Sequence, residues 1–368
     1  MRTEATWASV RFMGNRQSIA ERFDARRNSL NFIRLTLAGL VVIAHTWPVG
    51  GYGSTPFLGD QDIGDWAVAG FFTISGFLIT GSRLASSSAR SYYWKRFLRI
   101  YPGFLAALLV VAFVAAPVAG LINSNGSYQI VDGITYVLKN LGLFIFQRDI
   151  GNTLTGMPFD EAWNSPLWTL SYEAACYVVV GVLVSFLPRR HVRWVVIWVL
   201  VLCVAVTIPQ AIDAVNLPLL FARGLRLGGF FAAGATLYFF RGAVPLTGLL
   251  AACAAGLTAV TMYLGVFQAL AGLPVAYLLL YLGSTLPFHR IGVPNDISYG
   301  IYIYGFPIQQ LLAMSLSDLS VPIPVFVALS LGLTMPLALA SWFVVEKPAL
   351  RLRRLPSSRR IHEQSWPA

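Results

Sequence analysis

The stretch that decides the fold is NSLNFIRLTLAGLVVIAHTW, residues 28–47, an apolar run that carries one arginine and one histidine. Arg34 and His45 are separated by about three helical turns plus about 20°, so both side chains share one face of the helix. Their separation along the helix axis is about 16 Å, roughly half the hydrocarbon thickness of a bilayer. Because ionisable groups in a membrane span usually face protein or a wet cavity, the pair predicts a polar track through the membrane.

The rest of the chain has the composition of an integral membrane protein. Of its 368 residues, 56% are hydrophobic and 12% are charged, whereas soluble domains are about 25% charged. The apolar runs are too long for barrel strands and lack strict alternation, so we expect an all-α, polytopic protein with about ten transmembrane helices. The predicted spans are 30–48, 65–82, 100–121, 166–187, 194–210, 217–240, 244–264, 268–287, 297–316 and 322–346. The shorter apolar stretch 134–147 contains Lys139 and is predicted to be re-entrant or interfacial.

The positive charge of the chain, +11 net, is unevenly distributed. Basic residues cluster in four segments: 1–29, 83–99, 188–193 and 347–360. By the positive-inside rule these segments and both termini are cytoplasmic, which indicates a membrane topology rather than a nucleic-acid partner. The tail arginines are interpreted as topology signals and contacts to anionic lipid. We therefore expect a basic N-terminal segment (1–29), a transmembrane domain (30–348) and a basic tail (349–368).

Two ionisable residues are candidates for catalysis in the outer half of the membrane. His45 titrates near neutrality and could serve as a general base, the alternative being a hydrogen-bonded packing histidine. Glu173 ends the run WNSPLWTLSYE (163–173) at a similar depth. It could orient His45, or it could form an ion pair with a buried arginine, and both interpretations stay open. The other polar candidates are predicted to bind an acceptor or to be structural: Arg223, Arg226, Trp168, Ser171 and Ser75.

A basic and aromatic segment, YYWKRFLRIYP (92–102), marks a cytoplasmic entry into the membrane. Arg96 and Arg99 are three residues apart and share a helix face. Paired guanidinium groups suit a phosphate ligand, although interfacial anchoring would produce the same spacing. There is no Walker loop, no dinucleotide glycine fingerprint and no histidine pair at metal spacing, so we expect no metal and no tightly bound cofactor.

Several of these segments together resemble the membrane-bound acyltransferase 3 family, over about residues 28–350. Arg34 and His45 are similar to its Arg-x10-His motif, and Arg96 and Arg99 to its Arg-x-x-Arg motif. The other similar segments are SGFLI (75–79), PLWTLSYE (166–173), ISYGIYIYGFP (297–307) and VEKP (345–348). The chain departs from the family pattern where many members carry acidic residues or a histidine, at Ala69, Ala174 and Gly305.

The resemblance implies O-acyl transfer from acyl-coenzyme A, with acetyl as the first candidate, to a hydroxyl of a surface polysaccharide or lipid-linked glycan. It implies a catalytic role for His45 and donor binding by Arg96 and Arg99; with the derived topology, Arg34 would line the donor's route and Glu173 would orient the histidine. The expected location is the bacterial inner membrane, and the expected partners are acyl-coenzyme A, a carbohydrate acceptor and membrane lipid. A transporter or flippase of a glycan or small solute is the alternative function.

Overall fold

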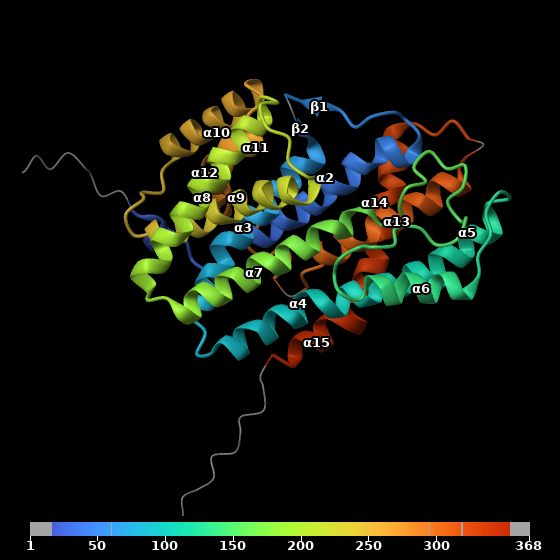
Figure 1. Ribbon diagram of the computed structural model, residues 1–368, viewed down its shortest axis with the longest axis horizontal. Helices are drawn as coiled ribbons and strands as arrows, with labels where there is room; N and C mark the ends of the chain where they lie inside the picture. The colour runs from blue at the N-terminus through green and yellow to red at the C-terminus, as the bar shows by residue number, and fades with distance from the viewer. Residues whose placement is uncertain (1–16, 60, 294, 318, 354–368) are drawn as a thin grey trace, which may run out of the picture.

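The computed structural model describes residues 17–59, 61–293, 295–317 and 319–353, which form a bundle of helices (Figure 1). About 72% of the chain is helical, which confirms the predicted all-α class. Within the described ranges the strands are two short ones, β1 (Phe57–Leu58) and β2 (Gln61–Asp62), which pair antiparallel. The outermost parts of the two predicted basic termini, 1–16 and 354–368, lie outside the described residues.

Within the described residues, six helical stretches are long and apolar enough to cross a membrane, and each overlaps a predicted span. Three of them are single helices: α2 (Leu30–Gly50), α3 (Ile63–Leu84) and α8 (Arg189–Ala211). The run Ala89–Ile122 consists of α4 (Ala89–Val110), η1 (Val111–Ala115) and α5 (Ala116–Ile122), and the run Ser165–Phe186 consists of η2 (Ser165–Leu167) and α7 (Trp168–Phe186). The run Ile323–Arg351 consists of α14 (Ile323–Ser341), η3 (Trp342–Glu346) and α15 (Lys347–Arg351). These stretches make the chain a multi-pass membrane protein.

The other four predicted spans also form helices, but each of these helices is either shorter or less apolar than the six above. They are α9 (Leu219–Phe240), α10 (Gly248–Tyr263), α12 (Gly272–Thr285), which follows the short α11 (Phe267–Leu270), and α13 (Ser298–Ser315). α10 and α12 have only 16 and 14 residues, and α9 carries two arginines. The prediction of ten spans therefore goes beyond the six that length and composition support.

The outer faces of the long helices carry large apolar side chains that water would disfavour. Leu121 is 88% exposed, Phe186 81%, Trp198 68% and Val344 74%. Extensive exposed apolar surface of this kind is expected where lipid rather than water surrounds the protein.

α2 and α3 lie in the middle of the bundle (Figure 1). α2 packs against α3 on one side and α13 on the other, while α9 packs against both α3 and α8. The main hydrophobic core joins α2 to α4 and α13 through Leu37, Val41, Phe104 and Ile303. Because α2 is central, both of its ends lie beside several other helices. The polar candidates from those helices therefore lie near the two ends of α2.

Two glycines allow α3 and α9 to approach closely. A Cβ on Gly76 would lie 2.0 Å from the carbonyl oxygen of Phe231, and a Cβ on Gly234 would lie 2.0 Å from that of Thr73. Larger side chains would therefore separate the two helices. Small residues of this kind are the usual means by which membrane helices pack at short range.

The connector between α5 and η2 contains one helix, α6 (Ile130–Asn140), which packs against η1. Its 11 residues are too few to cross a bilayer. The remainder is irregular but held in place, since the buried Trp163 indole donates to the Thr153 hydroxyl at 2.8 Å. At the other end of the chain, the short helix α1 (Ile19–Arg22) precedes α2.

Candidate active site

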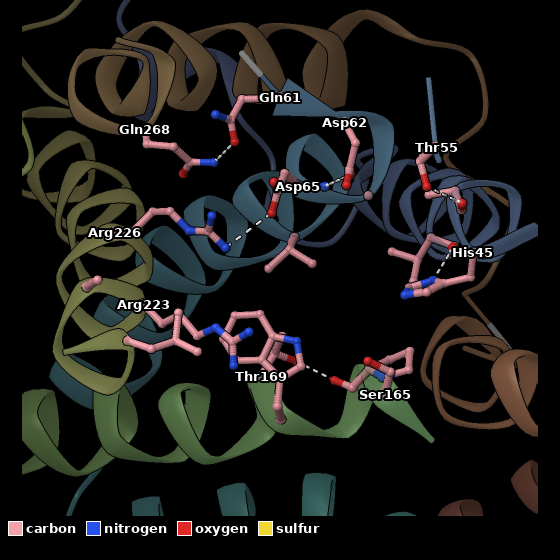
Figure 2. Close-up of a pocket in the computed structure, with 18 of the residues that line it drawn as sticks. His45, Thr55, Gln61, Asp62, Asp65, Ser165, Thr169, Arg223, Arg226 and Gln268 are labelled. Atoms are coloured by element: carbon pink, nitrogen blue, oxygen red, sulfur yellow. Dashed lines mark hydrogen bonds and ion pairs between the residues drawn. The ribbon is translucent and has the colours of Figure 1, made fainter. Parts of the chain in front are cut away.

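A cavity of about 690 Å³ opens beside the C-terminal half of α2, and His45 projects into it (Figure 2). We call it the histidine cavity. Its lining includes polar and aromatic side chains from several helices and from β2: His45, Thr55, Gln61, Asp62, Asp65, Trp168, Thr169, Arg223, Arg226, Gln268 and Tyr302. A concave site of this size with a few convergent polar groups has the properties of a small-molecule binding site.

The orientation of His45 is fixed by its own helix. Its Nδ1 lies 2.7 Å from the carbonyl oxygen of Val41, and the edge of its ring meets Phe306 at a centroid distance of 5.0 Å. A carbonyl oxygen only accepts hydrogen bonds, so Nδ1 must carry the proton. The lone pair of the neutral ring is therefore on Nε2, which is the arrangement that a general base requires.

The wall opposite His45 presents arginines and an aromatic face (Figure 2). Arg226 forms an ion pair with Asp65 at 3.1 Å, and the guanidinium of Arg223 lies 4.4 Å from the ring centroid of Trp168. Flat aromatic faces beside fixed polar groups suit a ligand that carries many hydroxyls. Asp65 lies one helical turn before Ala69, so the same helix still supplies a carboxylate although Ala69 departs from the family pattern.

A second cavity, of about 530 Å³, lies at the N-terminal end of α2, and we call it the arginine cavity. Six basic residues line it: Arg34, Arg96, Arg99, Lys347, Arg351 and Arg353. The acidic residue in its lining is Asp296. The excess of positive charge makes this cavity suited to an anion with several negative groups. The tail arginines that sequence analysis interpreted as topology signals and lipid contacts thus contribute to this cavity.

Asp296 neutralises part of this charge. Its Oδ2 lies 2.6 Å from Arg99 and 3.4 Å from Arg34, and its Oδ1 accepts from the hydroxyl of Ser298 at 2.6 Å. Although burial raises its pKa, the Arg99 and Arg34 guanidinium groups and the hydrogen bonds from Ser298 outweigh that effect and hold the pKa of Asp296 well below its usual range. Asp296 therefore stays charged and fixes the two arginines.

Arg96 is held much less tightly than Arg99. Its guanidinium lies 5.9 Å from the ring centroid of Tyr177, and its buried Nε has no hydrogen-bond partner within the described residues. A buried donor without a partner is costly, and Arg96, unlike Arg99, lines the arginine cavity without an ion-pair partner in the part of the chain that the structure describes.

A third cavity, of only about 40 Å³, adjoins both of the others, and we call it the waist. It shares Val68, Thr169 and Tyr302 with the histidine cavity and Arg34 with the arginine cavity. The predicted polar track therefore corresponds to two chambers at the two ends of α2 and a narrow region between them.

Glu173 lines the waist rather than the histidine cavity. Its Oε1 accepts hydrogen bonds from the hydroxyls of Ser75, at 3.1 Å, and Tyr177. Within the described residues it forms neither of the two contacts considered from sequence, because His45 is bonded to a backbone carbonyl and the arginines of α9 pair with Asp65 and Trp168. Ser171 lies outside the three cavities described above, and its hydroxyl donates to the backbone of its own helix.

The sequence analysis missed Asp65 and Asp296 as partners of the predicted arginines. Asp65 begins a predicted span and could have been noticed as a carboxylate at a helix end. Asp296 lies in a loop 262 positions after Arg34, and nothing in the local pattern links the two.

Comparison with known proteins adds a family to this geometry. The chain matches a family described as an acyltransferase domain over residues 27–343, which include both large cavities except for the last residues of the arginine cavity. The chain belongs to the acyltransferase 3 family. No solved structure matches it.

This acyltransferase is similar over nearly its whole length to two relatives. An O-acetyl transferase of Shigella phage Sf6 is 26% identical over 88% of this chain and 96% of its own. Nodulation protein 10 of Rhizobium leguminosarum bv. viciae is 29% identical over 93% of this chain and 98% of its own. Acyltransferase MdmB of Streptomyces mycarofaciens is 28% identical over 38% of this chain and 34% of its own. Acyl transfer is thus the activity that the family supports.

Proposed function

We propose that this protein transfers an acyl group, acetyl in the first instance, from acyl-coenzyme A to a hydroxyl of a carbohydrate, with His45 as the general base. The observation that carries the proposal is the pair of chambers at the two ends of α2. One holds a histidine with its Nε2 lone pair available, and the other holds an excess of arginines, of which Arg96 has an unpartnered donor.

The arginine cavity fits the charged end of coenzyme A, which carries a pyrophosphate and a further phosphate. Arg96 and the basic residues of the C-terminal segment would bind these phosphates, because Arg34 and Arg99 are already engaged by Asp296. The pantetheine arm would extend along Arg34 and through the waist. Its thioester would then lie near His45, about 16 Å from Arg34 along the α2 axis.

The histidine cavity would hold the acceptor, with Trp168, Arg223 and the glutamines opposite His45 recognising a sugar. Nε2 of His45 removes the proton of the acceptor hydroxyl as the hydroxyl oxygen forms a bond to the thioester carbonyl carbon. The carbon–sulfur bond then breaks and the sulfur leaves as a thiolate. His45 passes the proton that it took from the hydroxyl to this thiolate. General bases of this kind contribute about 10²- to 10⁴-fold in rate.

By the positive-inside rule, the arginine cavity, whose lining includes basic residues of the C-terminal segment, would face the cytoplasm, and the histidine cavity would face the outer side. This topology agrees with a donor made in the cytoplasm and a glycan acceptor on the far side of a bacterial inner membrane. The family's acyltransferase activity and the O-acetyl transferase of Shigella phage Sf6 support this proposal.

The proposal can be tested with acetyl-coenzyme A labelled in its acetyl group. Membrane vesicles with the cytoplasmic face outward and containing the full-length protein should transfer label to membrane glycan. His45→Ala should abolish this transfer, while His191→Ala, the same change at an exposed position outside the cavities, should not. Equal labelling with His45→Ala would refute the catalytic role. Solute uptake without acyl transfer would indicate a transporter, and mass and NMR analysis of the glycan would locate the modified hydroxyl.

A further inference from the structure

The waist is far narrower than the chambers that it adjoins. Its volume of about 40 Å³ compares with about 690 and 530 Å³ for the histidine and arginine cavities. Such a space holds a file of roughly three water molecules. An extended chain with planar amide and thioester groups fits so small a space, whereas a tetrahedral carbon that carries a methyl branch needs more room.

Hydrogen bonds make the walls of the waist rigid on the side of Tyr302. The Thr169 hydroxyl, the Tyr302 hydroxyl and the carbonyl oxygen of Pro166 form a triangle with oxygen–oxygen distances of 2.6, 3.0 and 3.1 Å, in which the two hydroxyl protons form two hydrogen bonds at a time. Tyr302 is only 7% exposed. This triangle joins α13 to the start of α7, so the two helices cannot separate there without leaving buried hydroxyls unpaired, which is unfavourable.

Aromatic rings form another part of the lining. Phe71 of α3 meets the ring of Tyr302 edge to face at a centroid distance of 5.7 Å, and Phe72 and Tyr299 also line the space. Dense packing leaves such rings little room to move. The width of the waist is therefore set by Phe71, Thr169 and Tyr302 together.

The charged residues that line the waist are Arg34 and Glu173. The described hydrogen bonds of Glu173 both go to Oε1, which leaves Oε2 free to accept a further bond. A guanidinium donor and a carboxylate acceptor beside a narrow apolar passage suit a thin arm that carries amide groups, as the pantetheine arm does.

We propose that the waist selects the acyl group by its width, passing unbranched acyl chains and excluding chains branched next to the thioester carbonyl. This inference rests on the proposed acyl-coenzyme A donor, because the acyl group must then pass the waist to reach His45. The pantetheine arm itself carries a geminal dimethyl group close to the phosphates. Because this branched carbon would not pass the waist either, it would stay in the arginine cavity and limit how far the arm extends toward His45.

A competition between two donors tests this selection. Detergent-permeabilised membranes containing the full-length protein receive equal amounts of butyryl- and isobutyryl-coenzyme A, whose acyl groups contain the same atoms and differ only in branching. The acyl groups on the membrane glycan are then released by alkali and separated by gas chromatography. The ratio of the two is independent of how much protein has folded.

Phe71→Ala widens the waist, and Thr169→Ser removes one methyl group while it keeps the hydroxyl that bonds to Tyr302. Phe77→Ala, which removes the same volume from α3 outside the waist, is the matched control. Both waist variants should raise the isobutyryl share by about tenfold or more, the lower end of what one methylene is worth in an apolar pocket. The control should leave the ratio as in the wild type.

Two results would overturn the inference. One is a wild-type protein that transfers butyryl and isobutyryl groups equally. The other is an isobutyryl-to-butyryl ratio in both waist variants that stays within about twofold of the wild-type ratio, well below the discrimination that one methylene provides. A wild-type protein that transfers no acyl group from acetyl-, butyryl- or isobutyryl-coenzyme A would overturn the donor proposal and the waist with it, and that outcome is distinct from the other two.

Discussion

Arg96 and Arg99 lie less than one turn apart on α4, yet their surroundings predict opposite consequences when each is replaced by glutamine. Arg99 is bonded to Asp296 at 2.6 Å, with side-chain exposures of 14% and 16% for the two residues. Among the described residues, Arg96 has a contact with the ring of Tyr177 and an Nε without a hydrogen-bond partner. We expect Arg99→Gln to lower stability and Arg96→Gln to weaken donor binding.

The stability effects follow from what each substitution leaves behind. Removing one partner of a buried ion pair costs about 3–5 kcal/mol, because the remaining charge stays buried. Asp296 would keep Arg34 at 3.4 Å and its bonds from Ser298, so we expect the low end, about 3 kcal/mol. Arg96→Gln loses only a cation–π contact, which contributes about 0.5–1 kcal/mol.

The binding effects run the other way. A hydrogen bond to a charged group contributes about 1.5–3 kcal/mol, which corresponds to a KM for acetyl-coenzyme A raised about 10- to 150-fold in Arg96→Gln. Arg96→Lys, which keeps the charge without the planar group, should recover part of this loss.

Two measurements separate the effects: thermal unfolding of the purified protein in detergent, and the KM for acetyl-coenzyme A in permeabilised membranes. The reasoning would be refuted if both glutamine variants lost the same stability. It would also be refuted if Arg96→Gln changed the KM by less than about twofold, since that is below the smallest contribution estimated for a charged hydrogen bond.

Three further predictions concern other residues. His45→Ala should lower kcat for acyl transfer by about 10²- to 10⁴-fold and leave the KM for acetyl-coenzyme A nearly unchanged, because the phosphates bind at the other end of α2; a large rise in that KM would contradict the assignment. Trp168→Ala should raise the KM for the glycan acceptor about fivefold, for a loss of about 1 kcal/mol, without changing the KM for the donor. Because the pKa of Asp296 is lowered in the folded protein, its contribution to stability is present above its unfolded pKa of about 3.9 and is lost as the pH falls further. Thermal unfolding of Asp296→Asn should therefore show lower stability at pH 7 and a smaller decline in acid than the wild type, and parallel pH profiles would contradict this account.

The parts of the fold that depend on local periodicity could be predicted from the sequence. The spacing of Arg34 and His45 on one helix places them in cavities at the two ends of α2, as expected from 3.6 residues per turn. Hydropathy located the helices but not all of their ends. The span predicted to begin at residue 100 lies in a helix, α4, that already begins at Ala89, because the basic and aromatic residues before the apolar run are helical too.

Pairing between distant parts of the chain could not be predicted in the same way. Glu173 and the arginines of α9 enter the membrane from the same side, which made an ion pair a reasonable expectation. Asp65 takes that place for Arg226, because the close packing of α3 on α9 brings its N-terminal end to the arginine. Depth in the membrane limits which residues can meet, but helix packing determines which of them do.

The division of charge along α2 gives a physical reason for the chemistry at each end. Arg34 is stabilised by Asp296, which lies in the loop before α13, so these charged groups are paired at the end of α2 where we propose that the donor binds. His45 is bonded to a carbonyl oxygen instead of a carboxylate, and a neutral ring in a membrane helix needs no counter-charge. The absence of a carboxylate on Nδ1 leaves the protonated ring less stabilised than in a Ser-His-Asp triad. A thioester suits such a base, because the thiolate is a good leaving group and accepts the proton that the base has taken from the acceptor hydroxyl.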